Sequence, residues 1–422
     1  MRSRSPPLAA LVSALLLAAA LPAAGEARTL RVDSEAAFAA AVQELGRQGG
    51  TIVLGAGRYD VLRISRYGKP LTIRGPRDAV VRWLSLEQAR AVRLVGLRIR
   101  SRRLGARLVI AHSRNILVHR LRIRGKVDVP AWLKLHRSHR VTIRLSDFTR
   151  CGERETCILT GRTSRLRLVG NRFHDCRGCD FLRGRFGPGM LIRENRFDRA
   201  LRGPCGRNPD VCRHQDLIEL QGGRNLVVER NRFGVYQLPG GGQLYLLKDI
   251  RNVVIRNNVF LFQDPRVPGA KAHVGINLGG RHVVPRNVLI THNTILSGWP
   301  RPAKGLDGSV RFADRYARLP RSQWPILVNN VMRIARNPGQ LCRWARLSTA
   351  NVILEGTPCS AGDVVGNPRL DQYGRPTAGS TLLIDRGDPR WPTWVDFAGS
   401  RRDARPDIGA YEYAVRGRRS GI

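Results

Sequence analysis

One pattern, an apolar run ending in Ile or Phe, recurs eight times along the chain. The segments are VRLVGLRI, ILVHRLRI, VTIRLSDF, LRLVGNRF, MLIRENRF, LVVERNRF, VVIRNNVF and VLITHNTI, and they end at Ile99, Ile123, Phe148, Phe173, Phe197, Phe233, Phe260 and Ile295. Successive ends are 24, 25, 25, 24, 36, 27 and 35 residues apart. A repeat of this length, with β-branched residues at every second position, predicts stacked strands. We therefore expect an all-β solenoid whose function lies on its outer surface.

The N-terminus has the parts of a secretory signal. Arg2 and Arg4 precede an apolar stretch that is shorter than the roughly 20 residues needed to span a bilayer. An uncleaved membrane anchor is the alternative. We predict a signal peptide over 1–27, an N-terminal cap and first coils over 28–70, β-helix coils over 71–340, and a last coil with a C-terminal cap and basic tail over 341–422. The mature protein is expected to be a secreted or periplasmic monomer without a transmembrane helix.

An amphipathic helix is expected to close the first coil. Ser34 is a favourable N-cap for a helix over Glu35–Leu45, with strands at Arg28–Val32 and from Thr51 to Leu54. A solenoid exposes an apolar end at its first coil, so a capping element is needed there.

The chain is strongly basic, with a net charge of +41, but only six of its 73 basic residues are lysines. An excess of Arg this large also follows from a GC-rich genome, so the charge is a weak signal for any particular partner. The positive field nevertheless attracts polyanions. For an exported protein, an acidic polysaccharide is the expected partner rather than nucleic acid, for which the sequence shows no aromatic binding signature.

Eight cysteines in an exported chain favour disulfides. Cys342 is expected to pair with Cys359. Among the other six, the repeat alignment allows Cys176 to pair with Cys212, and Cys205 with Cys212 equally well. A zinc site that uses Cys176 and Cys179 with a nearby histidine, His174 or His214, is the alternative.

Two recurring residue types have structural roles. Asn recurs two positions before the last residue of the repeat, where it suits a left-handed corner and can hydrogen-bond its neighbour in the next coil. These are Asn171, Asn195, Asn231, Asn258, Asn293 and Asn330. Phe173, Phe197, Phe233 and Phe260 are expected to form an interior stack.

With these features, the chain from about Arg28 to Tyr413 resembles the secreted bacterial right-handed parallel β-helix proteins, the superfold of the pectate lyases. The ending LLIDRGDPRWPTWVDFAGSRRDARPDIGAYEY is similar to the ending of many of them. Its matching residues are Asp385, Gly387, Asp396, Gly399, Arg402, Asp407, Gly409 and Glu412. The resemblance implies a right-handed parallel β-helix with an N-terminal capping helix and a C-terminal cap. For Trp391 and Trp394 in this ending, cap packing is favoured over a sugar-stacking role.

Side-chain alternation predicts one outward strip of residues. The pairs Leu133 and Leu135, Ile158 and Thr160, Leu182 and Gly184, Ile218 and Leu220, and Tyr245 and Leu247 are expected to point inward. The residues between them then face solvent, because side chains alternate across a strand. These are Lys134, Leu159, Arg183, Glu219 and Leu246.

The resemblance implies that catalysis takes place on such an outward strip. In uronate lyases and epimerases a basic residue removes the proton next to the sugar carboxylate, and a second cation or Ca²⁺ stabilises the resulting charge. Lys134 or Lys248 is the expected base and Arg183 or Lys134 the expected stabilising cation, with Glu219 in the same strip. The residues expected to bind substrate are Arg185, His214, Asp216 and Asn277. No cofactor is certain, and Ca²⁺ is a possible one.

The function we expect is therefore a polysaccharide lyase or C5-epimerase that acts on a uronate-containing polysaccharide. One alternative is a non-catalytic protein that binds polyanions or the envelope, with the strip as ordinary solvated ions. Another is a glycoside hydrolase that uses Asp216 and Glu219.

Overall fold

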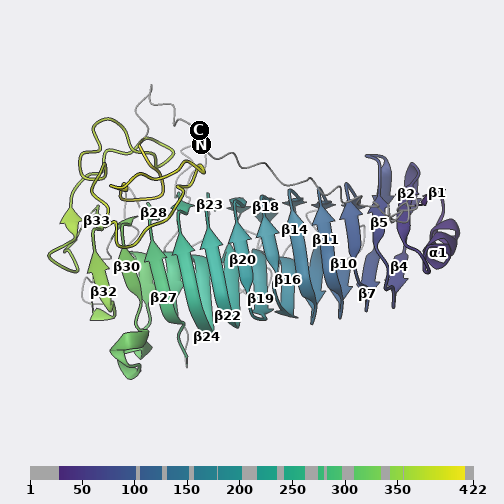
Figure 1. Cartoon of the computed structure of the whole chain (residues 1–422), viewed down its shortest axis with the longest axis horizontal. Coiled ribbons are helices and arrows are strands. Elements are labelled where there is room, and N and C mark those ends of the chain that lie inside the picture. The colour runs from purple at the N-terminus through teal and green to yellow at the C-terminus, as the bar shows by residue number, and fades with distance from the viewer. Residues whose placement is uncertain are drawn as a thin grey trace, which may run out of the picture.

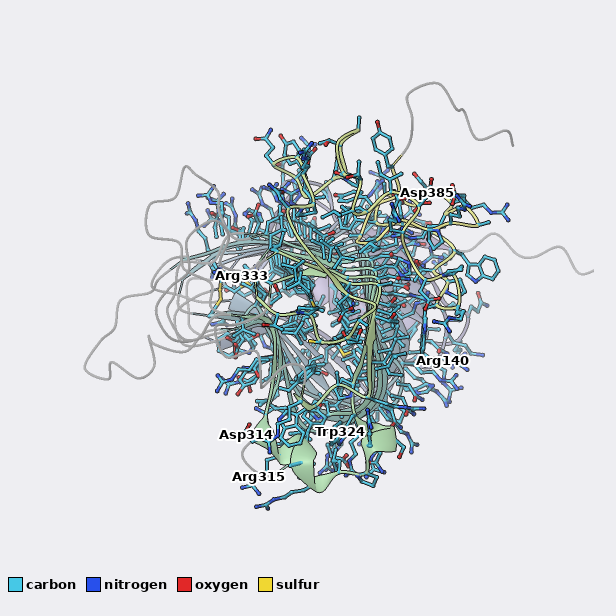
Figure 2. All side chains as sticks on the ribbon, turned by 90° about the vertical axis from the view of Figure 1, so that its left-hand side faces the viewer. Arg140, Asp314, Arg315, Trp324, Arg333 and Asp385 are labelled. Carbon is cyan, nitrogen blue, oxygen red and sulfur yellow. A yellow bond between two sulfur atoms is a disulfide. The ribbon has the colours of Figure 1, made fainter. Side chains whose placement is uncertain are left out.

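The computed structural model describes residues 28–100, 105–125, 131–151, 156–177, 179–201, 216–234, 242–261, 274–279, 283–296, 308–333, 343–354 and 356–413. The described strands form a long parallel β-helix (Figure 1). This architecture is the all-β parallel β-helix that the repeat predicted. Figure 2 looks along the solenoid axis, and its strands form the walls of a tube.

The N-terminal end is capped as expected. Strand β1 (Thr29–Val32) leads into helix α1 (Glu35–Glu44), whose N-cap Ser34 accepts a hydrogen bond from the Ala37 N–H. Phe38 and Ala41 are the buried residues of the helix. Together with Leu45 they cover the apolar end of the tube.

Each coil contributes strands to three faces of the tube. Face 1 contains β4 (Leu62–Ser65), β7 (Leu84–Glu87), β10 (Gly105–Ala111), β13 (Ala131–His136), β16 (Thr156–Thr163), β19 (Asp180–Phe186), β26 (Val274–Leu278) and β29 (Gly308–Phe312). Face 2 contains β1, β2 (Gly50–Leu54), β5 (Leu71–Arg74), β8 (Val92–Val95), β11 (Arg114–His119), β14 (His139–Arg144), β17 (Arg167–Val169), β20 (Met190–Arg193), β27 (Arg286–Thr291), β30 (Ile326–Val328) and β32 (Leu347–Thr349).

Two long strands run through faces 1 and 2 and join them into one sheet. They are β22 (Ile218–Glu229) and β24 (Gly242–Arg256). The short segments η1 (Asp314–Arg318) and η2 (Arg321–Gln323) lie between β29 and β30, at the lower corner in Figure 2.

Face 3 is a separate sheet of short strands. It contains β3 (Gly57–Tyr59), β6 (Ala79–Val81), β9 (Arg98–Arg100), β12 (Arg122–Arg124), β15 (Asp147–Thr149), β18 (Arg172–Arg177), β21 (Arg196–Leu201), β23 (Arg232–Phe233), β25 (Val259–Phe260), β28 (Thr294–Ile295), β31 (Val331–Met332), β33 (Val352–Ile353) and β34 (Val364–Val365). The labelled members of this face lie along the upper edge of the tube in Figure 1.

A stack of phenylalanine rings fills the interior under face 3, as the sequence predicted. The ring centroids of Phe173 and Phe197 are 4.9 Å apart, those of Phe197 and Phe233 are 5.1 Å apart, and those of Phe233 and Phe260 are 4.4 Å apart. Phe148 extends the stack by one coil, at 4.7 Å from Phe173. All of these rings are fully buried, so identical side chains in consecutive coils pack as one continuous core.

An asparagine ladder runs along the corner between faces 2 and 3, also as predicted. Asn171 Oδ1 accepts the Ser146 N–H at 3.0 Å, and in each later coil the Asn Oδ1 accepts the backbone N–H of the ladder Asn in the preceding coil at 2.9–3.0 Å. The ladder continues beyond the six predicted members to Asn351, whose N–H donates to Asp363 Oδ1. The ladder therefore gives hydrogen-bond partners to buried backbone N–H groups at the corner, where strand pairing supplies none.

The predicted left-handed conformation falls one residue earlier than expected. The residue before each ladder Asn has positive φ, for example Glu194, Arg230 and His292, while the ladder Asn residues do not. The physical reason is that the Asn side chain must turn inward to reach the next coil. The residue before it therefore takes the corner.

The C-terminal cap packs over the last coils, above the left end of the tube in Figure 1. Arg402 is buried, and its Nη1 donates to Glu412 Oε2 at 2.7 Å. Its Nη2 donates to Asn257 Oδ1 at 3.1 Å, which ties the cap to a coil. Within the described residues, no helix is both long and apolar enough to cross a bilayer.

Replacing Asn231 tests the ladder. Asn231→Ala removes the acceptor of the Asn195 N–H and the donor to the Ile192 and Glu229 carbonyl oxygens. We expect a loss of about 2–4 kcal/mol in unfolding free energy, because buried polar groups lose their partners. Guanidinium unfolding followed by circular dichroism measures the change. Thr142→Ala, on the outward side of β14, is the control and should change stability by less than about 0.5 kcal/mol. Equal effects of the two variants would contradict this role for the ladder.

Candidate functional site

The three charged residues predicted to share an outward strip do lie in one row of face 1. Lys134 pairs with Leu159 in the next coil, Leu159 with Arg183, and Arg183 with Glu219. Adjacent coils are about 4.8 Å apart, so Arg183 and Glu219 are direct neighbours, while Lys134 is about 14 Å from Glu219. Lys134 and Glu219 therefore cannot act on the same atom.

The fourth position of the row corrects the sequence prediction. Glu219 pairs with Tyr245, and Leu244 and Leu246 are the buried residues on either side. The expectation that Leu246 faces outward, with Tyr245 and Leu247 inward, was therefore wrong by one residue. The cause is an irregularity between Gln221 and Gly223, where the later coil holds one extra residue. A slip of one residue exchanges the two sides of a strand.

The row continues beyond Tyr245 with two more polar residues. Tyr245 pairs with Asn277, and Asn277 pairs with Arg311. Asn277 was predicted to bind substrate from its position in an inserted region, and the structure places it in the row itself. Arg311 was not predicted, because it lies outside the eight clear repeats. We call Lys134, Leu159, Arg183, Glu219, Tyr245, Asn277 and Arg311 the face-1 row.

Arg183 provides positive charge beside two carboxylates. Its Nε lies 3.6 Å from Glu219 Oε2 and 3.9 Å from Asp180 Oδ2. The Arg183 side chain is 50% exposed, while that of Glu219 is only 8% exposed. A ligand above the row can thus reach the guanidinium while Glu219 holds it in place.

Below the row, two buried aspartates form a ladder of their own. The Asp216 N–H donates to Asp180 Oδ1 at 2.9 Å, and the Gly242 N–H donates to Asp216 Oδ1 at 2.6 Å. Burial raises the pKa of Asp180 to about 7, and burial and the adjacent Asp180 raise the pKa of Asp216 well above its usual range. This pair retains a proton near neutral pH.

This position corrects two roles predicted for Asp216. Asp216 is fully buried at the start of the face-1 strand, so it is not a substrate-binding residue on the surface. For the same reason Asp216 and Glu219 do not form the exposed pair of carboxylates that a glycoside hydrolase needs. The fixed backbone contact of Asp216 Oδ1 indicates a structural role.

The environment of Tyr245 keeps its phenol protonated. Burial and then the negative charge of Asp216 raise the pKa of Tyr245, while Arg311 opposes this effect. At neutral pH Tyr245 is therefore a proton donor rather than a base.

Lys248 lies beside the row rather than in it. Its Nζ donates to Gln221 Oε1 at 2.9 Å, and Gln221 Nε2 donates to Glu219 Oε1. Lys248 thus reaches the site through Gln221 and helps to orient Glu219. Arg185 is exposed two residues beyond Arg183 on β19, so it extends the positive charge on the same side. His214 lies outside the described residues.

The carboxylates of this region do not fit the expected Ca²⁺. Calcium takes six to eight oxygen ligands. Here one oxygen of Asp180 and one of Asp216 accept backbone N–H groups, and the Arg183 guanidinium lies between Asp180 and Glu219. Arg183 itself supplies positive charge at this point.

The cysteines form local disulfides. Cys151 is bonded to Cys157, and Cys176 to Cys179. The Cys176–Cys212 pairing that the repeat alignment allowed is therefore wrong, because Cys176 is bonded to Cys179 three residues later. The zinc alternative fails for the same reason: although Cys157, Cys176 and Cys179 cluster, their sulfurs are bonded to other sulfurs. Cys359 is also disulfide-bonded, and its predicted partner Cys342 lies outside the described residues.

A cavity of about 560 Å³ lies in the C-terminal cap. It is lined by Pro389, Pro392, Thr393, Trp394, Arg401, Arg402, Asp403, Ala404 and Pro406, none of which belongs to the face-1 row. Trp394 is 76% exposed, so the expectation that it packs into the cap was wrong.

No protein-family profile and no curated protein sequence matches this chain. Among solved structures it is similar to an alginate lyase from Paenibacillus sp. str. FPU-7, with 14% identity over 67% of this chain and 97% of that one and a TM-score of 0.47. It is also similar to the pectate lyase Pel9A, with 13% identity over 89% and 91% and a TM-score of 0.42. The surface adhesin PfbA of Streptococcus pneumoniae has 13% identity over 62% and 82% and a TM-score of 0.43. The activity is therefore argued from the residues of the site.

The pKa of Asp180 predicts an unusual pH dependence of stability. Because the pKa is raised from 3.8 to about 7, the native state holds this proton more tightly than the unfolded chain, and stability falls as the pH rises from about 4 to 7. Asp180→Asn keeps the oxygen that accepts the Asp216 N–H but cannot ionise. We expect its melting temperature to exceed that of the wild type by at least about 2 °C at pH 8 and to approach it at pH 4.

Asp249→Asn is the control with the opposite sign. A hydrogen bond from Arg251 lowers the pKa of Asp249, so this carboxylate stabilises the fold at neutral pH and loses that effect in acid. The variant should be slightly less stable than the wild type at pH 7 and equal to it in strong acid. A pH-independent loss of stability in Asp180→Asn would contradict the protonated aspartate ladder.

Proposed function

We propose that this protein is an exported polysaccharide lyase that cleaves a uronate-containing polysaccharide by β-elimination at the face-1 row. The observation that supports it is the order of side chains in one row on the outer side of face 1, in which Arg183 is half exposed and Glu219 lies buried beside it. A cation, a carboxylate, a phenol, an amide and a second cation follow one another at one-coil intervals: Arg183, Glu219, Tyr245, Asn277 and Arg311.

The two arginines account for substrate binding. Arg183 binds the carboxylate of the sugar to be cleaved and stabilises the negative charge that develops on it in the transition state. Arg311 lies four coils away, about 19 Å, and binds the carboxylate of a sugar further along the chain. The Asn277 amide donates a hydrogen bond to the part of the sugar chain that lies between the two arginines.

Glu219 and Tyr245 account for the proton transfers. Glu219 removes the proton from C5, and the C5–H electron pair forms the C4–C5 double bond as the C4–O4 bond breaks. The protonated phenol of Tyr245 donates its proton to O4, the leaving oxygen. Water then returns a proton to the phenolate, and Glu219 releases its proton. The products are one chain whose new nonreducing end is an unsaturated uronide and a second chain whose new reducing end carries the protonated O4 as its anomeric hydroxyl.

The one-sided geometry selects the stereochemistry. Both proton-transfer groups lie on the same face of the tube, so they approach one side of the sugar. In D-mannuronate and D-glucuronate the C5 hydrogen and O4 lie on the same side of the ring, whereas in D-galacturonate and L-guluronate they lie on opposite sides. Elimination from mannuronate or glucuronate therefore fits the row, and C5-epimerisation, which needs groups on both sides, fits it less well.

The predicted lysine bases take different roles in this proposal. Lys134 is too far from Glu219 to share its reacting atom, so it contacts a more distant sugar. Lys248 orients Glu219 through Gln221. An acidic polysaccharide as the partner and an exported location remain parts of the same proposal.

The test is the appearance of ultraviolet absorbance from the unsaturated uronide. We expect it with polymannuronate or glucuronan and much less with polygalacturonate or polyguluronate. Glu219→Gln and Tyr245→Phe should each lower kcat by about 10²–10⁴ with little change in KM, and Arg183→Ala should also raise KM. Tyr413→Phe in the cap is the matched control and should be unchanged.

Three results would contradict this proposal. They are no product from any uronate polymer, new reducing ends without absorbance, or full activity in Tyr245→Phe. Tight, salt-sensitive binding without product would instead favour a non-catalytic polyanion-binding protein.

A further inference from the structure

Face 3 carries arginines that stack over one another in register. Arg98 pairs with Arg122, and Arg100 with Arg124. Two coils further along, Arg172 pairs with Arg196, and Arg196 pairs with Arg232. The residue between the two groups is Asp147. Like charges directly opposite each other destabilise a sheet, so such stacking requires compensation.

Five of these arginines form no salt bridge in the described part of the chain, although two of them, Arg122 and Arg172, flank Asp147 in register. The five are Arg98, Arg100, Arg122, Arg124 and Arg172, and we call them the face-3 array. The three carboxylates of the described face-3 strands are already engaged, and one of them, Asp175, lies 2.9 Å from Arg199 Nε. Asp147 lies 3.2 Å from His174 Nε2, and Asp198 lies 2.6 Å from Arg196 Nη2. Burial and then the charges of Arg98 and Arg124 lower the pKa of Arg100, as expected for cations that crowd one another.

Face 2 shows how the same protein compensates a row elsewhere. There Glu229 lies between Arg193 and Arg256 in consecutive coils, with oxygen–nitrogen distances of 2.8 and 2.6 Å. This alternation neutralises the row internally. On face 3 only Asp147 lies between arginines, Arg122 and Arg172, and it is shared with His174. Arg98, Arg100 and Arg124 have no carboxylate in register beside them, so their compensating charge must come from outside the described residues.

We propose that face 3 is a docking surface for an acidic polysaccharide that lies along the solenoid axis, separate from the face-1 row. Each guanidinium presents a fork of donors that matches a carboxylate. Arginines in neighbouring coils, such as Arg98 and Arg122, are about 4.8 Å apart, which is close to the length of one pyranose residue, so two successive sugars can each place a carboxylate on an arginine. The choice of a polyuronate among polyanions rests on the proposed function. The surface would hold long chains and supply them to the site.

At the C-terminal end of this face an aromatic ring continues the surface. The Arg232 guanidinium lies 5.7 Å from the Tyr373 ring centroid, and the Arg375 guanidinium lies 5.6 Å from the same ring. Tyr373 is 43% exposed. A sugar ring that leaves the arginines can therefore stack on Tyr373.

The test compares two triple variants that remove the same charge. Arg98→Ser, Arg122→Ser and Arg172→Ser together remove three members of the face-3 array. Arg74→Ser, Arg93→Ser and Arg167→Ser together remove three exposed arginines of face 2, which do not form a continuous row. Both triples are placed on Tyr245→Phe, so that the probe is not cleaved. The probe is a fluorescent polymannuronate that spans the solenoid, and its binding is followed by anisotropy between about 50 and 200 mM salt.

The face-3 triple should weaken binding about 30-fold at the low salt concentration. It should also reduce the slope of log affinity against log salt by about two to three, one counterion for each lost contact. The face-2 triple should change affinity by less than about threefold. Circular dichroism melting confirms that both triples are folded.

Three outcomes would overturn the docking surface. Equal weakening by both triples would mean that only net charge matters. Binding of a mannuronate trimer as tight as that of the polymer would exclude an extended surface, and an equal loss of duplex DNA binding would exclude a polyuronate preference. Activity on the trimer separates this inference from the proposed function: the face-3 triple on the wild-type background should cleave it normally. If neither the wild type nor any variant cleaves the trimer, the proposed function is wrong. The comparison of polymer binding by the two triples still tests the docking surface in that case.

Discussion

The in-register stacking of parallel strands is the constraint on which the rest of the structure depends. Each coil hydrogen-bonds only to the coils before and after it, so a residue type that recurs in the sequence becomes a continuous line in space. The asparagine ladder fixes this register at one corner, because each amide oxygen accepts the N–H of the preceding coil. The phenylalanine stack fixes it inside the tube. Functional residues far apart in sequence, such as Arg183 and Arg311, therefore fall in one row.

Stacking also brings like charges together, and the three faces respond differently. On face 2 a glutamate alternates with arginines and neutralises them. At the N-terminal ends of two face-1 strands, β19 and β22, Asp180 and Asp216 are stacked and buried. Their pKa values are raised, so the pair holds a proton that removes the repulsion between the two carboxylates. On face 3 the arginines of the face-3 array form no salt bridge within the described residues. The ion pairs of face 2 stabilise the fold, and the aspartate pair supports the face-1 row. The uncompensated arginines of face 3 leave a surface suited to a polyanion.

Much of the fold could be predicted from the sequence, because the repeat is strict. The period, the capping helix, the phenylalanine stack and the row through Lys134, Arg183 and Glu219 all follow from alternation and spacing. Tyr245 could not be placed correctly, because counting back from Phe260 crosses the extra residue beside Lys248. The positive φ of Lys248, at 61°, marks that irregularity in the structure but has no clear sequence signal.

Other parts of the site could not be predicted for different reasons. The burial of Asp216 depends on the Gly242 N–H in the following coil, which no local pattern reveals. The Cys176–Cys179 bridge could not be predicted, because the sequence allows several other pairings of the same cysteines equally well. Arg311 lies beyond the clear repeats, so it joins the row only through strand pairing.

The central claim is that Arg183, Glu219, Tyr245, Asn277 and Arg311 form one substrate-binding row. A crystal structure of the Tyr245→Phe protein with a mannuronate tetramer tests it most directly. The account predicts sugar density along face 1, with a carboxylate on Arg183, the C5 hydrogen toward Glu219 and O4 toward residue 245. Density confined to another face, or a residue 245 that points into the core, would contradict it.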